Sequence, residues 1–171
     1  MISSMEEKTL IEATVVFPVR EDGAVLLGKK VAKIGMGCWN GYGGGREAGE
    51  TLEQTAIREL YEESGLVAEA QALEKIAILH AYNHKTDGRV VPCAVHFYVA
   101  RHCTGEPTST EEMTTPTWFA IADLPLTEMM PADALWVPAA LGGKKLIVTV
   151  HYSPFQKEML QPIEIEEVLA L

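Results

Sequence analysis

Three glutamates are spaced so that a helix would gather their carboxylates on one face. Glu59, Glu62 and Glu63 stand at positions i, i+3 and i+4, and residues at these spacings are neighbours on a helix surface. Their repulsion would destabilise an isolated helix by roughly 0.2–0.5 kcal/mol per pair, so a cation should offset it. Hard divalent cations such as Mg²⁺ prefer carboxylate oxygens and often take waters and substrate phosphates as further ligands. The spacing therefore predicts metal-assisted phosphate chemistry; a solvated acidic helix face is the alternative.

A helix over residues 51–64 is expected to carry these glutamates. Thr51 and Gln54 match the capping-box pattern at its start, and Gly65 can supply the left-handed residue that ends it. Several apolar side chains fall roughly opposite the glutamates on a helical wheel and can pack on a sheet. These side chains are Ala56, Ile57 and Leu60.

Strands and one further helix are expected around this helix. The stretch 35–49 holds seven glycines and is expected to be a loop that leads into the helix. Residues 124–138, punctuated by prolines, are expected to hold a short second helix. Strands surrounding two helices indicate one α/β domain over residues 1–171 with a mixed sheet. From β-branched and apolar runs, the predicted strands cover residues 9–19, 24–28, 72–82, 90–100, 117–119, 145–152 and 162–168.

The composition is ordinary for a globular protein, with an acidic balance. The formal net charge is −10 and 47% of the residues are hydrophobic. Nucleic-acid binders usually carry a basic patch, so DNA is not an expected partner. No apolar run approaches the roughly 20 residues that cross a bilayer, and the first residues lack the features of a signal peptide. We therefore expect a cytoplasmic protein with no membrane partner; the oligomeric state stays open.

The cysteines and histidines give no pattern typical of a metal site. The three cysteines lack metal-ligand spacing, and their odd number suits a reducing compartment. His80 and His84 stand four residues apart, but in a segment predicted as strand and loop, where that spacing should not align them as ligands. The five histidines are therefore interpreted as surface or structural residues.

The string around the glutamates is the most specific signal in the chain. It reads Gly44-x5-Glu50-x7-Arg58-Glu59-Leu60-x-Glu62-Glu63-x-Gly65-Leu66. This resembles the Nudix box at every defining position over residues 44–66, without a gap. The resemblance implies an α/β/α sandwich in which the box forms loop, helix and loop. It also implies a hydrolase of phosphoanhydride bonds, in which metal-activated water attacks phosphorus and no covalent protein intermediate is needed.

The Nudix resemblance implies roles for the box residues. Glu59, Glu62 and Glu63 would bind Mg²⁺, or Mn²⁺ in its place, and the carbonyl of Gly43 would add a ligand. A carboxylate serves as general base in this family. Glu59 and Glu63 are the candidates inside the box, and the sequence does not rank them.

Two further charged residues take roles by the same resemblance. Arg58 would orient the carboxylates through Glu50 by charge-assisted hydrogen bonds. Glu112 falls where the family carries a further metal-binding or base glutamate. An ordinary loop charge is the alternative interpretation of Glu112.

Outside the box, the chain resembles the MutT-like branch typified by animal oxidised purine nucleoside triphosphatases. The matching segments are 39–44, 117–119 and 129–138, and the similarity runs with small gaps over about residues 10–168. This resemblance implies a Mg²⁺-dependent nucleoside triphosphate diphosphatase. Its substrates would be oxidised or normal purine nucleotides such as 8-oxo-dGTP, and its products a nucleoside monophosphate and pyrophosphate.

The same branch implies a nucleotide pocket lined by residues from the first half of the chain. Asn40 would hydrogen-bond the base edge, which suits a side chain with both donor and acceptor. Thr14 and Lys30 match other positions that line the pocket. A surface position at the end of a strand is the alternative for Lys30.

The segment that should read the base departs from the branch's pattern. Met130 stands where a stacking Trp is expected, and Ala132 replaces the first of two Asp residues, while Asp133 is retained. A methionine covers a purine face more loosely than an aromatic ring, and a site that loses buried hydrogen bonds becomes permissive. We therefore expect weak discrimination between oxidised and normal purines. Plain core packing is the alternative for the Met and Trp residues here.

Other functions within the family stay open at this stage. One is hydrolysis of nucleotide sugars, ADP-ribose or RNA 5′ ends, although the acidic charge disfavours RNA. Another is a non-catalytic module that senses a nucleotide and binds a partner. Degenerate modules usually lose box carboxylates, and this chain keeps Arg58, Glu59, Glu62 and Glu63.

Overall fold

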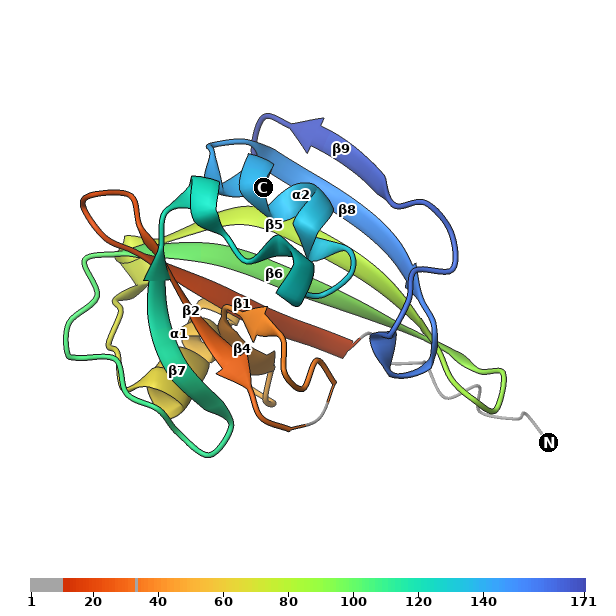
Figure 1. The fold of residues 1–171 in the computed structure, drawn as a ribbon, viewed down its shortest axis with the longest axis horizontal. Coiled ribbons are helices and arrows are strands. Elements are labelled where there is room, and N and C mark those ends of the chain that lie inside the picture. The colour runs from red at the N-terminus through yellow and green to blue at the C-terminus, as the bar shows by residue number, and fades with distance from the viewer. Residues whose placement is uncertain (1–10, 33) are drawn as a thin grey trace.

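One mixed sheet of nine strands forms the centre of the molecule in the computed structural model, which describes residues 11–32 and 34–171 (Figure 1). The strands are β1 (Ile11–Val19), β2 (Val25–Lys30), β3 (Trp39–Asn40), β4 (Tyr42–Gly45), β5 (Leu73–His84), β6 (Val90–Arg101), β7 (Met113–Phe119), β8 (Lys145–Tyr152) and β9 (Glu164–Val168). Seven of them follow the order β3-β2-β1-β6-β5-β8-β9, while β4 pairs with β1 and β7 with β2. β1 lies parallel to β6 and β5 parallel to β8, and the other pairs are antiparallel.

Two helices, α1 (Leu52–Ser64) and α2 (Asp133–Leu141), cover opposite faces of this sheet (Figure 1). On the α1 face, the fully buried Leu60 belongs to one apolar cluster with Tyr98 of β6. On the α2 face, Trp136 packs edge-on against Phe97, with ring centroids 4.6 Å apart. Phe97 and Tyr98 are consecutive, so alternation along β6 supplies both cores. The expected α/β/α arrangement with a mixed sheet is confirmed.

Local signals set the ends of α1 as predicted. The Thr51 hydroxyl accepts a hydrogen bond from the Gln54 N–H at 3.1 Å, and the Gln54 side chain accepts one from the Thr51 N–H at 2.9 Å. At the other end, Gly65 adopts φ 79° and its N–H donates to the Tyr61 carbonyl. These caps satisfy backbone groups that a helix end leaves unpaired.

The glycine-dense stretch 35–49 is not all loop, and this expectation was wrong. It contains β3 and β4, and β4 pairs with β1 so that Gly43 stands opposite Val15. A Cβ atom on Gly43 would lie 1.8 Å from the Thr14 carbonyl oxygen. Glycine is needed here because the two backbones approach too closely for any side chain.

The other predicted elements lie close to those observed. β8 spans the predicted residues, and it pairs with β9 as the expected final strand pair. β7 begins at Met113, before the predicted start, and α2 continues past Pro138 to Leu141. The predicted first strand began at Thr9, which lies outside the described residues. In the described parts of the chain, no helix is long and apolar enough to cross a membrane.

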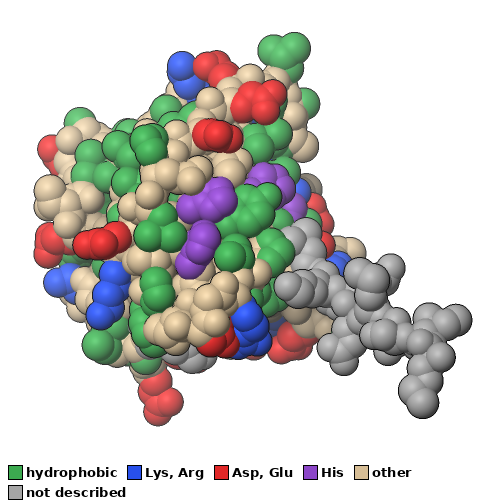
Figure 2. Space-filling view, turned by 90° about the vertical axis from the view of Figure 1, so that its right-hand side faces the viewer, with side chains coloured by type: hydrophobic (Ala, Val, Ile, Leu, Met, Phe, Trp, Pro, Cys, Tyr) green, Lys and Arg blue, Asp and Glu red, His purple; other side chains and the backbone are tan. Residues whose placement is uncertain are grey.

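One part of the α1 face stays partly open. α1 packs mainly over β4 and β1, and β5 and β8 carry the partly exposed His80, Tyr82 and His151 on this face. Figure 2 shows histidine side chains close together among hydrophobic ones at the end of the molecule where these strands finish. This surface is separate from the box helix.

Candidate active site

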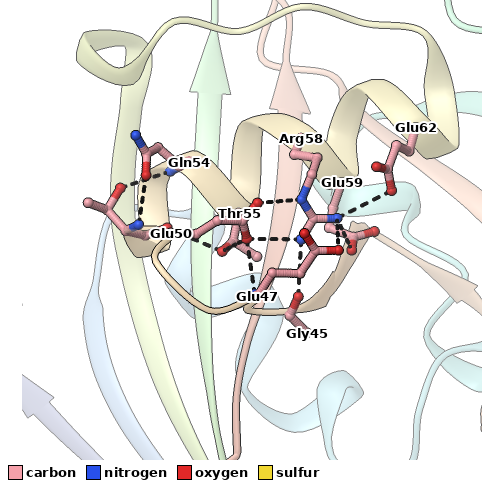
Figure 3. Close-up of polar contacts among 9 residues, drawn as sticks. Gly45, Glu47, Glu50, Gln54, Thr55, Arg58, Glu59 and Glu62 are labelled. Atoms are coloured by element: carbon pink, nitrogen blue, oxygen red, sulfur yellow. Dashed lines mark hydrogen bonds and ion pairs between the residues drawn. The ribbon is translucent and has the colours of Figure 1, made fainter.

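Arg58 connects the carboxylates of the box (Figure 3). Its Nε donates to Glu50 Oε1 at 2.5 Å and its Nη2 to Glu50 Oε2 at 3.0 Å. Its Nη1 donates to Glu59 Oε1 at 2.7 Å and to Glu62 Oε2 at 3.3 Å. The two-pronged bond to Glu50 fixes the plane of the guanidinium. Arg58 therefore sets the orientation of Glu59 from the first turns of the helix.

Glu50 is itself held in place from several sides. It accepts hydrogen bonds from the Thr55 hydroxyl at 2.7 Å and from the Glu47 N–H at 3.1 Å. The hydrogen bonds from Arg58 lower the pKa of Glu50 to about 2, with a smaller contribution from Thr55. The hydrogen bonds to Glu50 in turn raise the pKa of Arg58 above its ordinary value. Both groups therefore stay charged at neutral pH, and the pair ties the loop to the helix.

The three box glutamates differ in their surroundings, which the helical wheel did not predict. The Glu62 side chain is 54% exposed, whereas Glu63 is buried at 7% exposure. Burial raises the pKa of Glu63 to about 8, and the charges of Glu59 and Glu112 add to this effect. Burial also raises the pKa of Glu59, although Arg58 opposes it. Without a cation, these carboxyls repel one another in a partly dehydrated site.

A cavity of about 390 Å³ contains this group of carboxylates. The predicted metal-binding residues, which the structure brings together along its lining, are Gly43, Glu59, Glu62, Glu63 and Glu112. A Cβ atom on Gly44 would lie 2.5 Å from the Glu59 carboxyl carbon, so a larger residue would fill the space. The donors are all oxygens, which fits a hard divalent cation.

The carboxylates lie close together but are not arranged as a complete coordination shell. Among residues 11–32 and 34–171, no group of three or more His, Cys, Asp or Glu side chains is arranged as metal ligands. Glu59 and Glu62 each direct one oxygen to Arg58 instead. A cation would therefore use their other oxygens or require a side-chain rotation.

A second cavity, of about 260 Å³, adjoins the first. Lys30, Gly43, Gly44, Glu63 and Met113 line both cavities. All the residues predicted to bind substrate line the second one, and these are Thr14, Lys30, Asn40, Met130 and Asp133. We call it the base cavity and the first one the carboxylate cavity.

Polar residues line the base cavity, among them Thr14, Asn40 and Asp133. The Thr14 hydroxyl is fully buried and has no hydrogen-bond partner among the described residues, which costs free energy in the folded state. The Asn40 side-chain oxygen accepts the Gly41 N–H at 2.8 Å, which orients its amide group. Asp133, at the start of α2, is 4% exposed, and burial raises its pKa to about 7. Asp133 can therefore donate or accept a hydrogen bond near neutral pH.

The altered segment divides between cavity and core. Met130 lines the base cavity although it is 7% exposed. Ala132, where the branch has an aspartate, is fully buried and carries no polar group, and Trp136 belongs to the core beside Phe97. The core interpretation therefore holds for Trp136, whereas Met130 faces the cavity.

One wall of the base cavity was not predicted from the sequence. This wall comes from β5, β6, β8 and the segment after β8, and includes Leu79, Ala81, Cys93, Phe97, Tyr152 and Gln156. No motif marks these residues, because only strand pairing brings them to the cavity. A larger cavity of about 730 Å³ elsewhere, lined by Arg20 and Trp118 among others, contains none of the predicted residues.

Comparison with known proteins shows the family to which the chain belongs. The model of the NUDIX domain family matches residues 9–140. The chain is 40% identical over 129 residues to "Oxidized purine nucleoside triphosphate hydrolase" of Danio rerio, covering 75% of this chain and 79% of that protein. It is also 40% identical over 124 residues to the Mus musculus protein of the same name, covering 71% and 74%. The crystal structure of a mutator MutT protein from Bacillus halodurans matches with a TM-score of 0.73 and 26% identity, covering 92% of this chain and 98% of that one. The chain belongs to the NUDIX domain family.

Proposed function

We propose that this protein is a nucleoside triphosphate diphosphatase that cleaves oxidised or normal purine nucleotides. The products are a nucleoside monophosphate and pyrophosphate. The 40% identity to the zebrafish and mouse oxidized purine nucleoside triphosphate hydrolases supports the substrate class. The observation that carries the proposal is the shared wall of the two cavities. A nucleotide whose base occupies the base cavity would extend its phosphates into the carboxylate cavity.

Nudix hydrolases generally use divalent metal ions, and for this chain we propose Mg²⁺, with Mn²⁺ as a substitute. Glu59, Glu62, Glu63 and Glu112 would hold the ion, because they supply oxygen ligands around one cavity. When bound, such an ion neutralises phosphate charge, polarises a phosphoryl oxygen and makes water more acidic.

The protein's own groups orient the reactants and accept the proton. Water attacks phosphorus, an oxygen–phosphorus bond forms, and the phosphoanhydride bond breaks as pyrophosphate leaves. Glu59 or Glu63 accepts the proton of the attacking water. Arg58 donates a hydrogen bond to Glu59 at 2.7 Å and orients it, and Lys30, which lines both cavities, faces the phosphates with a positive charge.

The base cavity supports a permissive purine site. Asp133, Asn40 and Thr14 provide polar groups for the base or sugar, and Met130 covers one side. Ala132 leaves one carboxyl fewer than the branch carries, so fewer hydrogen bonds separate an oxidised from a normal purine. We therefore propose that normal purine triphosphates are cleaved alongside oxidised ones.

A substrate panel tests the proposal. The full chain with Mg²⁺ is given 8-oxo-dGTP, dGTP, ATP, a nucleotide sugar, ADP-ribose and 5′-triphosphorylated RNA, and the products are separated by chromatography. We expect pyrophosphate and a monophosphate from the purine triphosphates, with no products when Mg²⁺ is chelated. Higher kcat/KM for ADP-ribose, a nucleotide sugar or RNA would overturn the substrate assignment.

A further inference from the structure

Two histidines from different strands meet on the sheet face opposite the base cavity. His84 is the last residue of β5 and His151 lies near the end of β8, the neighbouring parallel strand. His84 Nε2 and His151 Nδ1 are 3.4 Å apart. Both side chains are half-buried. The two ring nitrogens therefore face one another at a surface that solvent reaches.

The distance between the nitrogens is long for a hydrogen bond and also suits two ligands of one metal ion. Hydrogen bonds from N–H donors usually span about 2.7–3.2 Å, and the 3.4 Å between His84 Nε2 and His151 Nδ1 exceeds this range. Two nitrogens, each about 2.0–2.1 Å from a tetrahedral zinc ion, lie about 3.4 Å apart. Imidazole is a preferred ligand of zinc, copper and nickel ions.

We propose that His84 and His151 bind a borderline divalent transition-metal ion, of which Zn²⁺, Cu²⁺ and Ni²⁺ are examples. This site is separate from the carboxylate cavity and does not depend on the proposed hydrolysis. The described residues hold no group of three or more His, Cys, Asp or Glu arranged as metal ligands. In the proposed site His84 and His151 are the side-chain ligands, and water completes the coordination.

The sheet holds the two ligands in place before any ion arrives. The pairing of β5 with β8 sets Tyr82 beside His151. The Tyr82 ring stacks on the His151 ring with centroids 4.7 Å apart and planes at 13°. The His151 carbonyl accepts a hydrogen bond from the Leu160 N–H at 2.8 Å. Binding therefore needs no rearrangement of the strands, which favours affinity.

His80 shares this face with His84, yet the strand separates the two. Strand residues four apart lie about 13 Å from one another, too far for one ion. The four-residue spacing of His80 and His84 along β5 therefore does not bring them to one ion. The partner of His84 is His151, which stands on another strand.

An ion at this site would join two strand ends that also carry a wall of the base cavity. Asn83 and Tyr152, the neighbours of the two histidines, are paired across β5 and β8. Tyr152 lines the base cavity, and Asn83 accepts a hydrogen bond at 2.7 Å from Gln156, which also lines it. Side chains alternate between the two faces of a sheet. A metal ion bound to His84 and His151 on one face would therefore also restrain Asn83 and Tyr152, whose side chains lie on the other face.

Titration of the full chain with Zn²⁺, in excess Mg²⁺ to occupy the carboxylates, tests the proposal. We expect one Zn²⁺ per chain by calorimetry. His84→Ala and His151→Ala should each weaken binding by roughly tenfold or more, because losing a ligand costs at least as much as losing an outer partner. His102→Asn is the control, since His102 follows the opposite end of β6. Zn²⁺ should raise the melting temperature of the wild type and this control, but not of the two alanine variants.

Cu²⁺ bound to the wild-type chain gives a readout that needs no variant to fold. Its electron paramagnetic resonance spectrum should show coupling to imidazole nitrogens. An oxygen-only spectrum, absence of binding, or Zn²⁺ affinity unchanged in both alanine variants would overturn the site. Mg²⁺-dependent nucleotide hydrolysis should persist in both variants. A chain that binds Zn²⁺ without hydrolysing nucleotides would contradict the proposed function and leave this site standing.

Discussion

The carboxylate cavity and the base cavity share a wall, but they are built from different amounts of chain. Most of the carboxylate cavity comes from residues 43–63, which form the end of β4, a loop and α1, with Lys30, Ala32, Glu112 and Met113 added. The base cavity draws on all strands from β1 to β8, on both α-helices and on the segment after β8. Residues close together in the sequence therefore supply most of the groups for the proposed hydrolysis. The proposed substrate specificity depends on residues from distant parts of the chain. Substitutions in the two cavities should have separable effects.

The largest expected effect is in the carboxylate cavity. Glu63→Gln should lower Mg²⁺-dependent hydrolysis by roughly 10²–10⁴-fold, because it removes a proposed metal ligand and candidate base. Thermal unfolding should change little, since glutamine keeps the shape and removes a buried ionisable group whose pKa burial raises. Steady-state kinetics and calorimetry measure the two quantities. The matched control is Glu47→Gln in the same cavity, and full activity of the Glu63 variant would refute the metal assignment.

A smaller loss should follow from Arg58→Lys. Lysine keeps the positive charge but cannot make the two-pronged bond to Glu50 or reach Glu59 with the same geometry. We expect a roughly 10–100-fold fall in kcat/KM and a higher Mg²⁺ requirement, as for lost partners of metal ligands. Activity measured across a Mg²⁺ series checks both. An unchanged Mg²⁺ requirement would show that Arg58 does not position the carboxylates.

In the base cavity, Asp133→Asn should alter selectivity rather than chemistry. We expect the ratio of kcat/KM between 8-oxo-dGTP and dGTP to change by roughly tenfold, which corresponds to about one hydrogen bond. The Mg²⁺ requirement should stay the same, because Asp133 is absent from the carboxylate cavity. If the ratio is unchanged, Asp133 does not read the base.

The same variant should change how stability depends on pH. The folded-state pKa of Asp133 is about 7, above the unfolded value of about 3.9. The folded state therefore binds more protons between these values, and this group's contribution to stability is lost as pH rises from about 4 to about 7. Denaturant unfolding of wild type and Asp133→Asn across this range should show a difference that shrinks or reverses with rising pH. A constant difference would contradict the raised pKa.

The smallest effect is expected from Thr14→Val. The buried hydroxyl has no partner among the described residues, so its loss should leave the free energy of unfolding unchanged or raise it by about 1 kcal/mol. If a nucleotide uses this hydroxyl, KM should rise by roughly fivefold, equivalent to a hydrogen bond of about 1 kcal/mol. Thr55→Val provides a contrast, because the Thr55 hydroxyl bonds Glu50 at 2.7 Å, and its loss should destabilise the helix start. A stable Thr14 variant with unchanged KM would remove Thr14 from the binding site.

Local spacing in the sequence suffices to predict α1, its caps and the placement of three glutamates on one helix face. Thr51, Gln54 and Gly65 act within one or two turns, and Glu59, Glu62 and Glu63 meet on one helix, because helical contacts join residues three or four apart. The resemblance to the family predicted that Met130 and Asp133 line the pocket, but it did not predict how deeply they are buried or which residues surround them.

Long-range packing determines which glutamate is buried, which glycines form β4, and which residues close the base cavity. Glu63 is buried because β4 pairs with β1 and brings Gly43 beside it, and Tyr152 reaches the cavity because β8 pairs with β5. The same pairing brings His84 to His151, 67 residues apart in sequence. Strand pairing joins distant residues, and its register depends on packing across the whole sheet. The spacing of residues along the chain therefore does not predict which strands pair or in which register.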